Sequence, residues 1–115
     1  MSKYFDHEKL DVYRAAIEFV VLVDQLIIDL PRGRAYLVDQ IQRAACSIAL
    51  NIAEGAGEYS SNEKIRFYRM AKRSATECAS ILDICNQLQL VDGQLFEKGR
   101  GLLLRIVAML IKLSK

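Results

Sequence analysis

Proline, tryptophan and histidine are scarce in this chain of 115 residues, which has one proline, no tryptophan and one histidine. A single proline leaves long stretches without a helix breaker, which favours helices over a turn-rich β fold. A metal site needs clustered ligands and a serine or cysteine nucleophile needs a nearby base, but His7 is the sole histidine. A phosphate-binding glycine loop and the Glu-x-x-His motif of di-iron bundles are also missing from the sequence. We therefore predict a protein without catalytic activity, metal or cofactor.

Excess charge of one sign and long apolar runs are scarce as well. Sixteen basic and fourteen acidic residues give a net charge of +2, too small to imply nucleic-acid binding unless the charges cluster. The longest uncharged stretch lies between Arg43 and Glu54, well short of the roughly 20 residues that span a bilayer. The charged start is unlike a signal peptide, and three cysteines, an odd number, fit a reducing compartment. We expect a cytoplasmic protein without a membrane segment.

Three turn signals divide the chain into four segments. They are Pro31-Arg32-Gly33, Gly55-Ala56-Gly57 and Asp92-Gly93. In each interval apolar residues recur at alternating steps of three and four, the spacing of one helical face. Links this short force neighbouring helices to run antiparallel. We predict an all-α, antiparallel up-down-up-down four-helix bundle, a single domain over residues 1–115, with helices at about 9–30, 34–55, 61–90 and 94–113.

Each predicted helix has one apolar face that we expect to be buried. The first helix has Val12, Ala16, Phe19, Val23, Leu26 and Leu30, and the second has Leu37, Ile41, Ile48 and Ile52. The third has Phe67, Ala71, Ser74, Cys78, Ile81, Cys85 and Leu88, and the fourth has Leu95, Gly99, Leu102, Ile106, Met109 and Leu113. Because Cys78 and Cys85 both lie on this face, we interpret them as small core residues rather than ligands or redox groups.

Local signals mark the helix ends. Ser60 and Glu63 have the spacing of a capping box at the start of the third helix. Either Gly55 or Gly57 is expected to supply the left-handed residue that ends the second. Gly99 and a second glycine at position 101 lie inside the fourth helix, where each costs roughly 1 kcal/mol relative to alanine. Two interpretations stay open: Gly99 permits a close helix approach, or the fourth helix frays or begins late.

A polar stripe on the second helix, directly beside its apolar face, is the first candidate site. Its members are Gln40, Arg43, Ser47, Asn51 and Glu54. A polar line so near the core, with an asparagine in mid-helix, is unusual for a purely solvated surface. We favour a hydrogen-bonded seam, within the bundle or between subunits, in which Arg43 and Glu54 pair with residues such as Glu77 or Arg73. The functional alternative is a small-molecule or nucleic-acid site.

Two groups of basic residues are candidates for phosphate contact. The basic cluster of the third helix comprises Arg66, Arg69, Lys72 and Arg73, and the basic row of the fourth comprises Lys98, Arg105 and Lys112. Arginine binds phosphate bidentately, and neutralising phosphates releases counterions. Tyr68, near the cluster, is a candidate for stacking on a base. The alternative is that these residues, with Arg32 and Arg34, form solvated faces or pair with Asp24, Asp29 and Glu58.

The middle of the chain resembles the four-helix-bundle family of 23S ribosomal RNA intervening-sequence proteins. The matching residues are Gln40, Arg43-Ala44-Ala45, Ser47-Ile48, Asn51-Ile52-Ala53-Glu54-Gly55, Phe67, Ala71, Ser74 and Glu77, with Leu10-Asp11-Val12-Tyr13 and Leu30-Pro31 nearer the start. The resemblance implies a homo-oligomer, a pentameric ring, with no enzymatic activity. The accessory proteins of diversity-generating retroelements look similar, which implies nucleic-acid binding and, by distant analogy, a reverse transcriptase as partner. Ala49-Leu50 departs from the family, where a proline before the asparagine is frequent.

Three functional hypotheses emerge. The first is a non-catalytic, homo-oligomeric bundle that binds nucleic acid through its basic helix faces. The second is a scaffold whose polar and basic surfaces meet another protein or a sister subunit, with no nucleic-acid role. The third is a small-molecule binder within the bundle.

Overall fold

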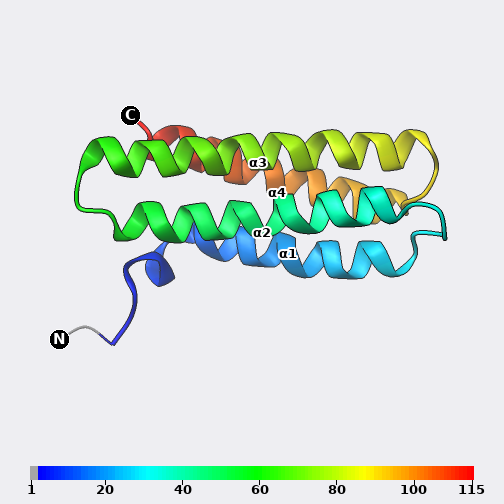
Figure 1. Cartoon of the computed structure of the whole chain (residues 1–115), viewed down its shortest axis with the longest axis horizontal. Helices are drawn as coiled ribbons and strands as arrows, with labels where there is room; N and C mark the ends of the chain where they lie inside the picture. The colour runs from blue at the N-terminus through cyan, green and yellow to red at the C-terminus, as the bar shows by residue number, and fades with distance from the viewer. Residues whose placement is uncertain (1–2) are drawn as a thin grey trace.

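The computed structural model describes residues 3–115, most of which lie in four α-helices; residues 1–2 of the predicted domain lie outside the described residues. The helices are α1 (Asp11–Ile28), α2 (Ala35–Gly57), α3 (Ser61–Gln87) and α4 (Gly93–Leu113). Figure 1 shows them side by side, each running opposite to the one before it. α1 and α3 each pack against both α2 and α4, in a molecule of 47 × 27 × 22 Å. The predicted all-α four-helix bundle is confirmed.

The chain enters α1 through a 3-10 turn at Asp6–Lys9 that the sequence pattern did not predict. The His7 ring in this turn lies 5.8 Å from the Phe5 ring and 4.5 Å from the Tyr13 ring, between centroids. The turn also packs against α2, so it covers one end of the α1–α2 pair. Among residues 3–115, no helix is both long enough and apolar enough to cross a membrane.

Two side chains cap the N-termini of helices. The Ser60 hydroxyl accepts a hydrogen bond from the Glu63 amide at 3.3 Å, as the capping-box pattern predicts. The Glu63 carboxylate does not return the bond, because it pairs with Arg66 at 2.8 Å. Asp92 accepts from the Gln94 amide at 3.2 Å, and α4 runs without a break from Gly93. The interpretation in which the fourth helix begins late is therefore wrong.

The helix ends depart from the predicted pattern. α2 continues through Gly57, and neither Gly55 nor Gly57 has a positive φ, so the prediction of a left-handed glycine there is wrong. α3 ends at Gln87, three residues earlier than predicted, because Gln89 adopts a φ of 58°. The Leu90 amide then bonds the carbonyl of Cys85 at 2.9 Å, and the Gln89 amide bonds that of Asn86 at 3.0 Å. These two bonds form a Schellman motif, with glutamine in the position that glycine usually takes.

The core confirms most of the predicted faces. All four predicted positions of α2 are buried, and so are Phe19 of α1 and Ile106 of α4. Each helix buries a wider arc than predicted because it contacts two neighbours, so Leu22, Leu82, Leu103 and Leu110 are buried too. The predictions fail at helix ends, where neighbouring helices no longer reach: Leu88 is 43% exposed and Leu113 is 39% exposed.

Gly99 is a point of close approach between α4 and two other helices. A Cβ atom at this position would lie 3.1 Å from Cδ1 of Leu82 in α3 and 3.3 Å from Cδ2 of Leu22 in α1. Both distances are shorter than ordinary van der Waals contact. This confirms the interpretation that Gly99 lets the fourth helix pack closely.

Candidate functional site

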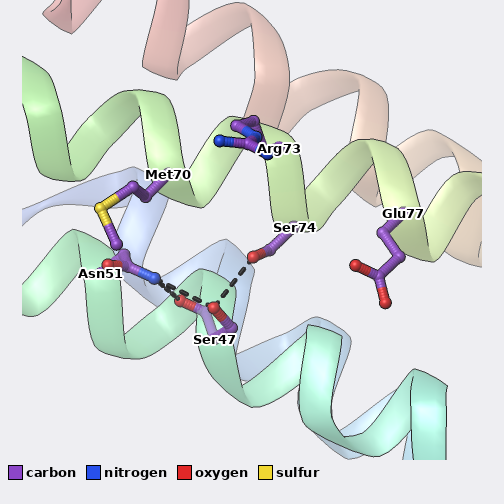
Figure 2. A pocket seen from close by; sticks show the side chains of 6 residues that line it. All are labelled: Ser47, Asn51, Met70, Arg73, Ser74 and Glu77. Carbon is purple, nitrogen blue, oxygen red and sulfur yellow. Dashed lines mark hydrogen bonds between the residues drawn. The ribbon is translucent and has the colours of Figure 1, made fainter.

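A shallow groove of about 360 Å³ runs between α2 and α3. We call it the α2–α3 groove. Its lining residues are Ser47, Asn51, Met70, Arg73, Ser74 and Glu77. The two from α2 are four residues apart and the four from α3 stand at positions i, i+3, i+4 and i+7, so each helix presents one face to the groove. Figure 2 shows Ser74 directed at Ser47, Met70 lying over Asn51, and Glu77 directed towards α2.

Ser47 is the centre of a hydrogen-bond network that joins the two helices. Its hydroxyl oxygen accepts from the Ser74 hydroxyl at 2.9 Å and from Asn51 Nδ2 at 3.0 Å (Figure 2). Asn51 Nδ2 also donates to the Ser47 carbonyl at 2.9 Å. All three side chains are half-buried, so the network is a polar contact at the edge of the core. Within residues 3–115 the amide oxygen of Asn51 accepts no hydrogen bond and remains available in the groove.

The polar stripe therefore divides into two parts. Ser47 and Asn51 form a hydrogen-bonded seam within the bundle, which is one of the two kinds of seam that the sequence predicted. The other three members, Gln40, Arg43 and Glu54, are exposed. In the described part of the chain neither Arg43 nor Glu54 belongs to an ion pair, so the expected pairing with Glu77 or Arg73 is not found inside the bundle.

The basic cluster of α3 lies along the outer side of that helix. Arg66 is bound at 2.8 Å by Glu63, which raises the pKa of the Arg66 guanidinium, and it lies 4.6 Å from the centre of the Phe67 ring. Arg69, Lys72 and Arg73 are exposed, and among residues 3–115 none of them is in an ion pair. These three cations border an open depression of about 610 Å³, together with the hydroxyls of Thr76 and Ser80 and the carboxylate of Glu77.

The basic row of α4 occupies a different side of the molecule. Lys112 lines a small cavity at the junction of α1 and α4 that Asp11 also lines. Lys98 and Arg105 share its helical face by their spacing of seven, and both are exposed. Arg73 lines the α2–α3 groove, at the opposite junction of the bundle. The fold therefore keeps the two basic groups apart instead of combining them into one surface.

One functional expectation for the start of α3 is wrong. Tyr68 is only 5% exposed, and its burial raises the pKa of its phenol, so it is not available to stack on a base. Its ring packs against Gly55, where a Cβ atom would lie 2.7 Å from Tyr68 Cε1. Sequence reasoning also missed Lys64, whose ammonium group donates to the carbonyls of Gly55 at 3.3 Å and Ala56 at 2.9 Å. The Gly55 carbonyl also accepts from the Glu58 amide at 3.2 Å, so Lys64 adds a second donor there and supplies a donor to the Ala56 carbonyl at the end of α2.

The cysteines lie where the core prediction placed them. Cys78 and Cys85 are fully buried free thiols, and burial raises the pKa of both, that of Cys78 to about 12. The third, Cys46, is an exposed free thiol. Across the described ranges no group of three or more histidine, cysteine or acidic side chains is placed to hold a metal ion.

These features define a class: an antiparallel four-helix bundle with a polar groove between α2 and α3, bordered by the exposed cations Arg69, Lys72 and Arg73 of α3. The chain belongs to the family of 23S rRNA-intervening sequence proteins, whose model matches residues 8–112. The resemblance seen in the sequence is thereby confirmed. A protein of unknown function from the S23 ribosomal protein family of Bacteroides thetaiotaomicron has a similar structure, with a TM-score of 0.83 and 24% sequence identity over 90% of this chain and 98% of that one. At this identity the similarity shows the fold alone. A search of curated proteins finds no match.

Proposed function

We propose that this protein is a non-catalytic, self-associating bundle of the cytoplasm that binds the phosphate backbone of nucleic acid through α3. The observation that carries the proposal is the set of Arg69, Lys72 and Arg73, three exposed cations within two helical turns that have no carboxylate partner in the described chain. A nucleic acid would give these cations the partner they lack and would gain entropy from released counterions. The exposed hydroxyl of Ser80 adds a neutral donor along the same depression.

A filter-binding salt series with random-sequence RNA and DNA tests this proposal. Three phosphate contacts predict an affinity that falls about 20- to 40-fold between 50 and 200 mM salt, because each contact releases close to one counterion. Absence of binding at 50 mM salt, or binding that ignores salt in this range, would contradict the proposal.

A matched pair of triple variants locates the surface. Replacing Arg69, Lys72 and Arg73 by glutamine is expected to abolish binding and its salt dependence. Replacing Lys98, Arg105 and Lys112 by glutamine removes the same charge from the α1–α4 side and should leave most of the affinity. Equal losses in both variants would show a diffuse effect of net charge, and a greater loss in the α4 variant would move the site to α4.

A second candidate is an interaction scaffold without a nucleic-acid role. Arg43 and Glu54 have no ion-pair partner among residues 3–115, and Leu50, on the same helix, is 62% exposed. A protein or sister subunit seated over the α2–α3 groove would supply those partners. This candidate predicts that Asn51→Ala or Arg43→Ala changes the oligomeric state in light scattering and leaves the helical content intact. The family resemblance adds the proposal that the assembly is a pentamer.

A further inference from the structure

A second depression lies beside the basic cluster, nearer the start of α3, and we call it the N-terminal depression. It has a volume of about 560 Å³, and its lining residues are Asn62, Ile65, Arg66, Arg69, Met70 and Arg73. Arg69 and Arg73 also border the open depression at which the phosphate contacts are proposed. The two depressions therefore share a wall of cations, and a nucleotide whose phosphate is bound at that wall can place its base in the N-terminal depression.

Met70 gives the N-terminal depression an exposed apolar surface. Its side chain is 38% exposed, and its sulfur lies 3.9 Å from Nη1 of Arg66. Ile65, which also lines the depression, is half-buried. A thioether packs favourably against an aromatic ring, and every nucleic-acid base has a flat π surface of this kind. Met70 can therefore contact an unpaired base, which the buried ring of Tyr68 cannot do.

Carboxylates on either side confine phosphates to the shared cations. Arg66 is paired with Glu63 at 2.8 Å. Glu63, through this hydrogen bond and its charge, and then Glu58 and Glu54 raise the pKa of the guanidinium. On the other side of the shared cations, the open depression has the carboxylate of Glu77. A phosphate is repelled by these carboxylates, so the part of a nucleotide that reaches into the N-terminal depression must be its uncharged base.

We propose that the N-terminal depression of α3 holds an unpaired base of a single-stranded nucleic acid whose phosphates lie at Arg69 and Arg73. This inference rests on the proposed phosphate binding and names the form of the strand. Phosphate contacts alone favour a duplex, whose charge density is higher, whereas a base contact at Met70 favours a single strand. The side-chain amide of Asn62, at the rim of the depression, offers donors and an acceptor to the polar edge of the base.

The test measures the affinity of the full chain for three labelled probes of equal length, by fluorescence anisotropy at about 50 mM salt. They are a single strand, the duplex of the same sequence, and an abasic single strand that keeps every phosphate and has no bases. We expect the ordinary single strand to bind about 2- to 10-fold more tightly than the abasic strand, which is the range of one contact between methionine and a ring. It should also bind more tightly than the duplex. DNA and RNA forms of each probe show which strand supplies the base.

Three variants locate the base on α3. Met70→Ala should weaken binding of the ordinary single strand by about 2- to 10-fold and leave binding of the abasic strand unchanged. Met70→Leu keeps an apolar surface and should retain most of the affinity. Ile84→Ala is the matched control, because Ile84 is 45% exposed on nearly the same side of α3, about 20 Å from Met70 along the helix. It should bind every probe like the unmodified protein, and circular dichroism verifies that each variant is folded.

The outcomes separate this inference from the proposal on which it rests. Equal affinity for the ordinary and abasic strands, or tighter binding of the duplex, would overturn the base contact and leave the phosphate contacts standing. So would a Met70→Ala variant that binds both strands more weakly by the same factor. Weaker binding of the single strand by Ile84→Ala would overturn the site, because it would show a general effect of exposed apolar surface. If no probe binds at this salt concentration, the proposed phosphate binding is removed as well.

Discussion

Two glycines at the end of α2, two residues apart, should respond oppositely to the same substitution. At Gly57 an added Cβ atom would meet nothing within 4 Å, so Gly57→Ala should gain helix propensity at no steric cost. At Gly55 the Cβ atom would lie 2.7 and 2.9 Å from two atoms of the Tyr68 ring and 3.1 Å from Cβ of Phe67. The Tyr68 ring is buried and Cβ of Phe67 is fixed to the backbone of α3, so neither can yield easily.

The magnitudes follow from these contacts. Alanine gains up to about 1 kcal/mol over glycine inside a helix, and less near its end. Overpacking a well-filled contact costs about 1–3 kcal/mol. Gly57→Ala should therefore raise the free energy of unfolding by about 0.5 kcal/mol, on the propensity scale. Gly55→Ala should lower it by up to about 2 kcal/mol, the difference between the two terms.

Chemical denaturation followed by far-UV circular dichroism measures both changes, with each variant compared at the same chain concentration because assembly adds to apparent stability. The thermal midpoint should move by about 4 °C for each kcal/mol in a domain of this size. A Gly55→Ala variant that is stabilised as much as Gly57→Ala would refute the conclusion that Gly55 is present for close approach to Tyr68.

Three further predictions concern Lys64 and the thiols. Lys64→Met should lower the free energy of unfolding by about 1 kcal/mol, because the Ala56 carbonyl at the end of α2 loses its donor and the Gly55 carbonyl keeps only the Glu58 amide. Lys72→Met should change it little, and denaturation curves compare the two. A neutral-pH thiol reagent should label Cys46 in the native protein and Cys78 only after unfolding, and rapid native labelling of more than one thiol would contradict the burial. Stability should also fall with rising pH between 9.0, the ordinary pKa of the Cys78 thiol, and about 12, its pKa in the fold. In that window the unfolded chain releases a proton that the native state keeps, so the free energy of unfolding falls by about 1.4 kcal/mol for each pH unit. Urea denaturation at several pH values measures this slope.

Helical periodicity predicted the bundle well because burial on one face repeats regularly along each helix. Positions such as Ile41 and Ile48 were found from sequence because every turn of α2 repeats the same environment. The end of α3 was missed because the left-handed residue is Gln89, a type that seldom adopts this conformation. The interpretation of Gly55 was wrong because its role depends on Tyr68, and sequence spacing does not say which residues of two helices face each other.

The candidate site could be predicted from the sequence only in part. Ser47 and Asn51 stood out because they follow the edge of an apolar face, and the structure joins them in one network. The basic cluster of α3 and the basic row of α4 look alike in the sequence, but the packing of the bundle places Arg73 and Lys112 at opposite junctions. Charges on flexible exposed side chains have no periodic signal that reveals their neighbours.

Two specific contacts join α2 and α3 at different positions along the helices. One is the hydrogen bond between the Ser47 and Ser74 hydroxyls, and the other is the packing of the Tyr68 ring against Gly55. A single contact would let one helix pivot or slide past the other, but two contacts a helical turn or more apart fix both movements. We therefore expect the α2–α3 pair to move as one unit, and local opening of the bundle to involve α1 or α4 before this pair separates. A partner of the α2–α3 groove would then meet a preformed surface.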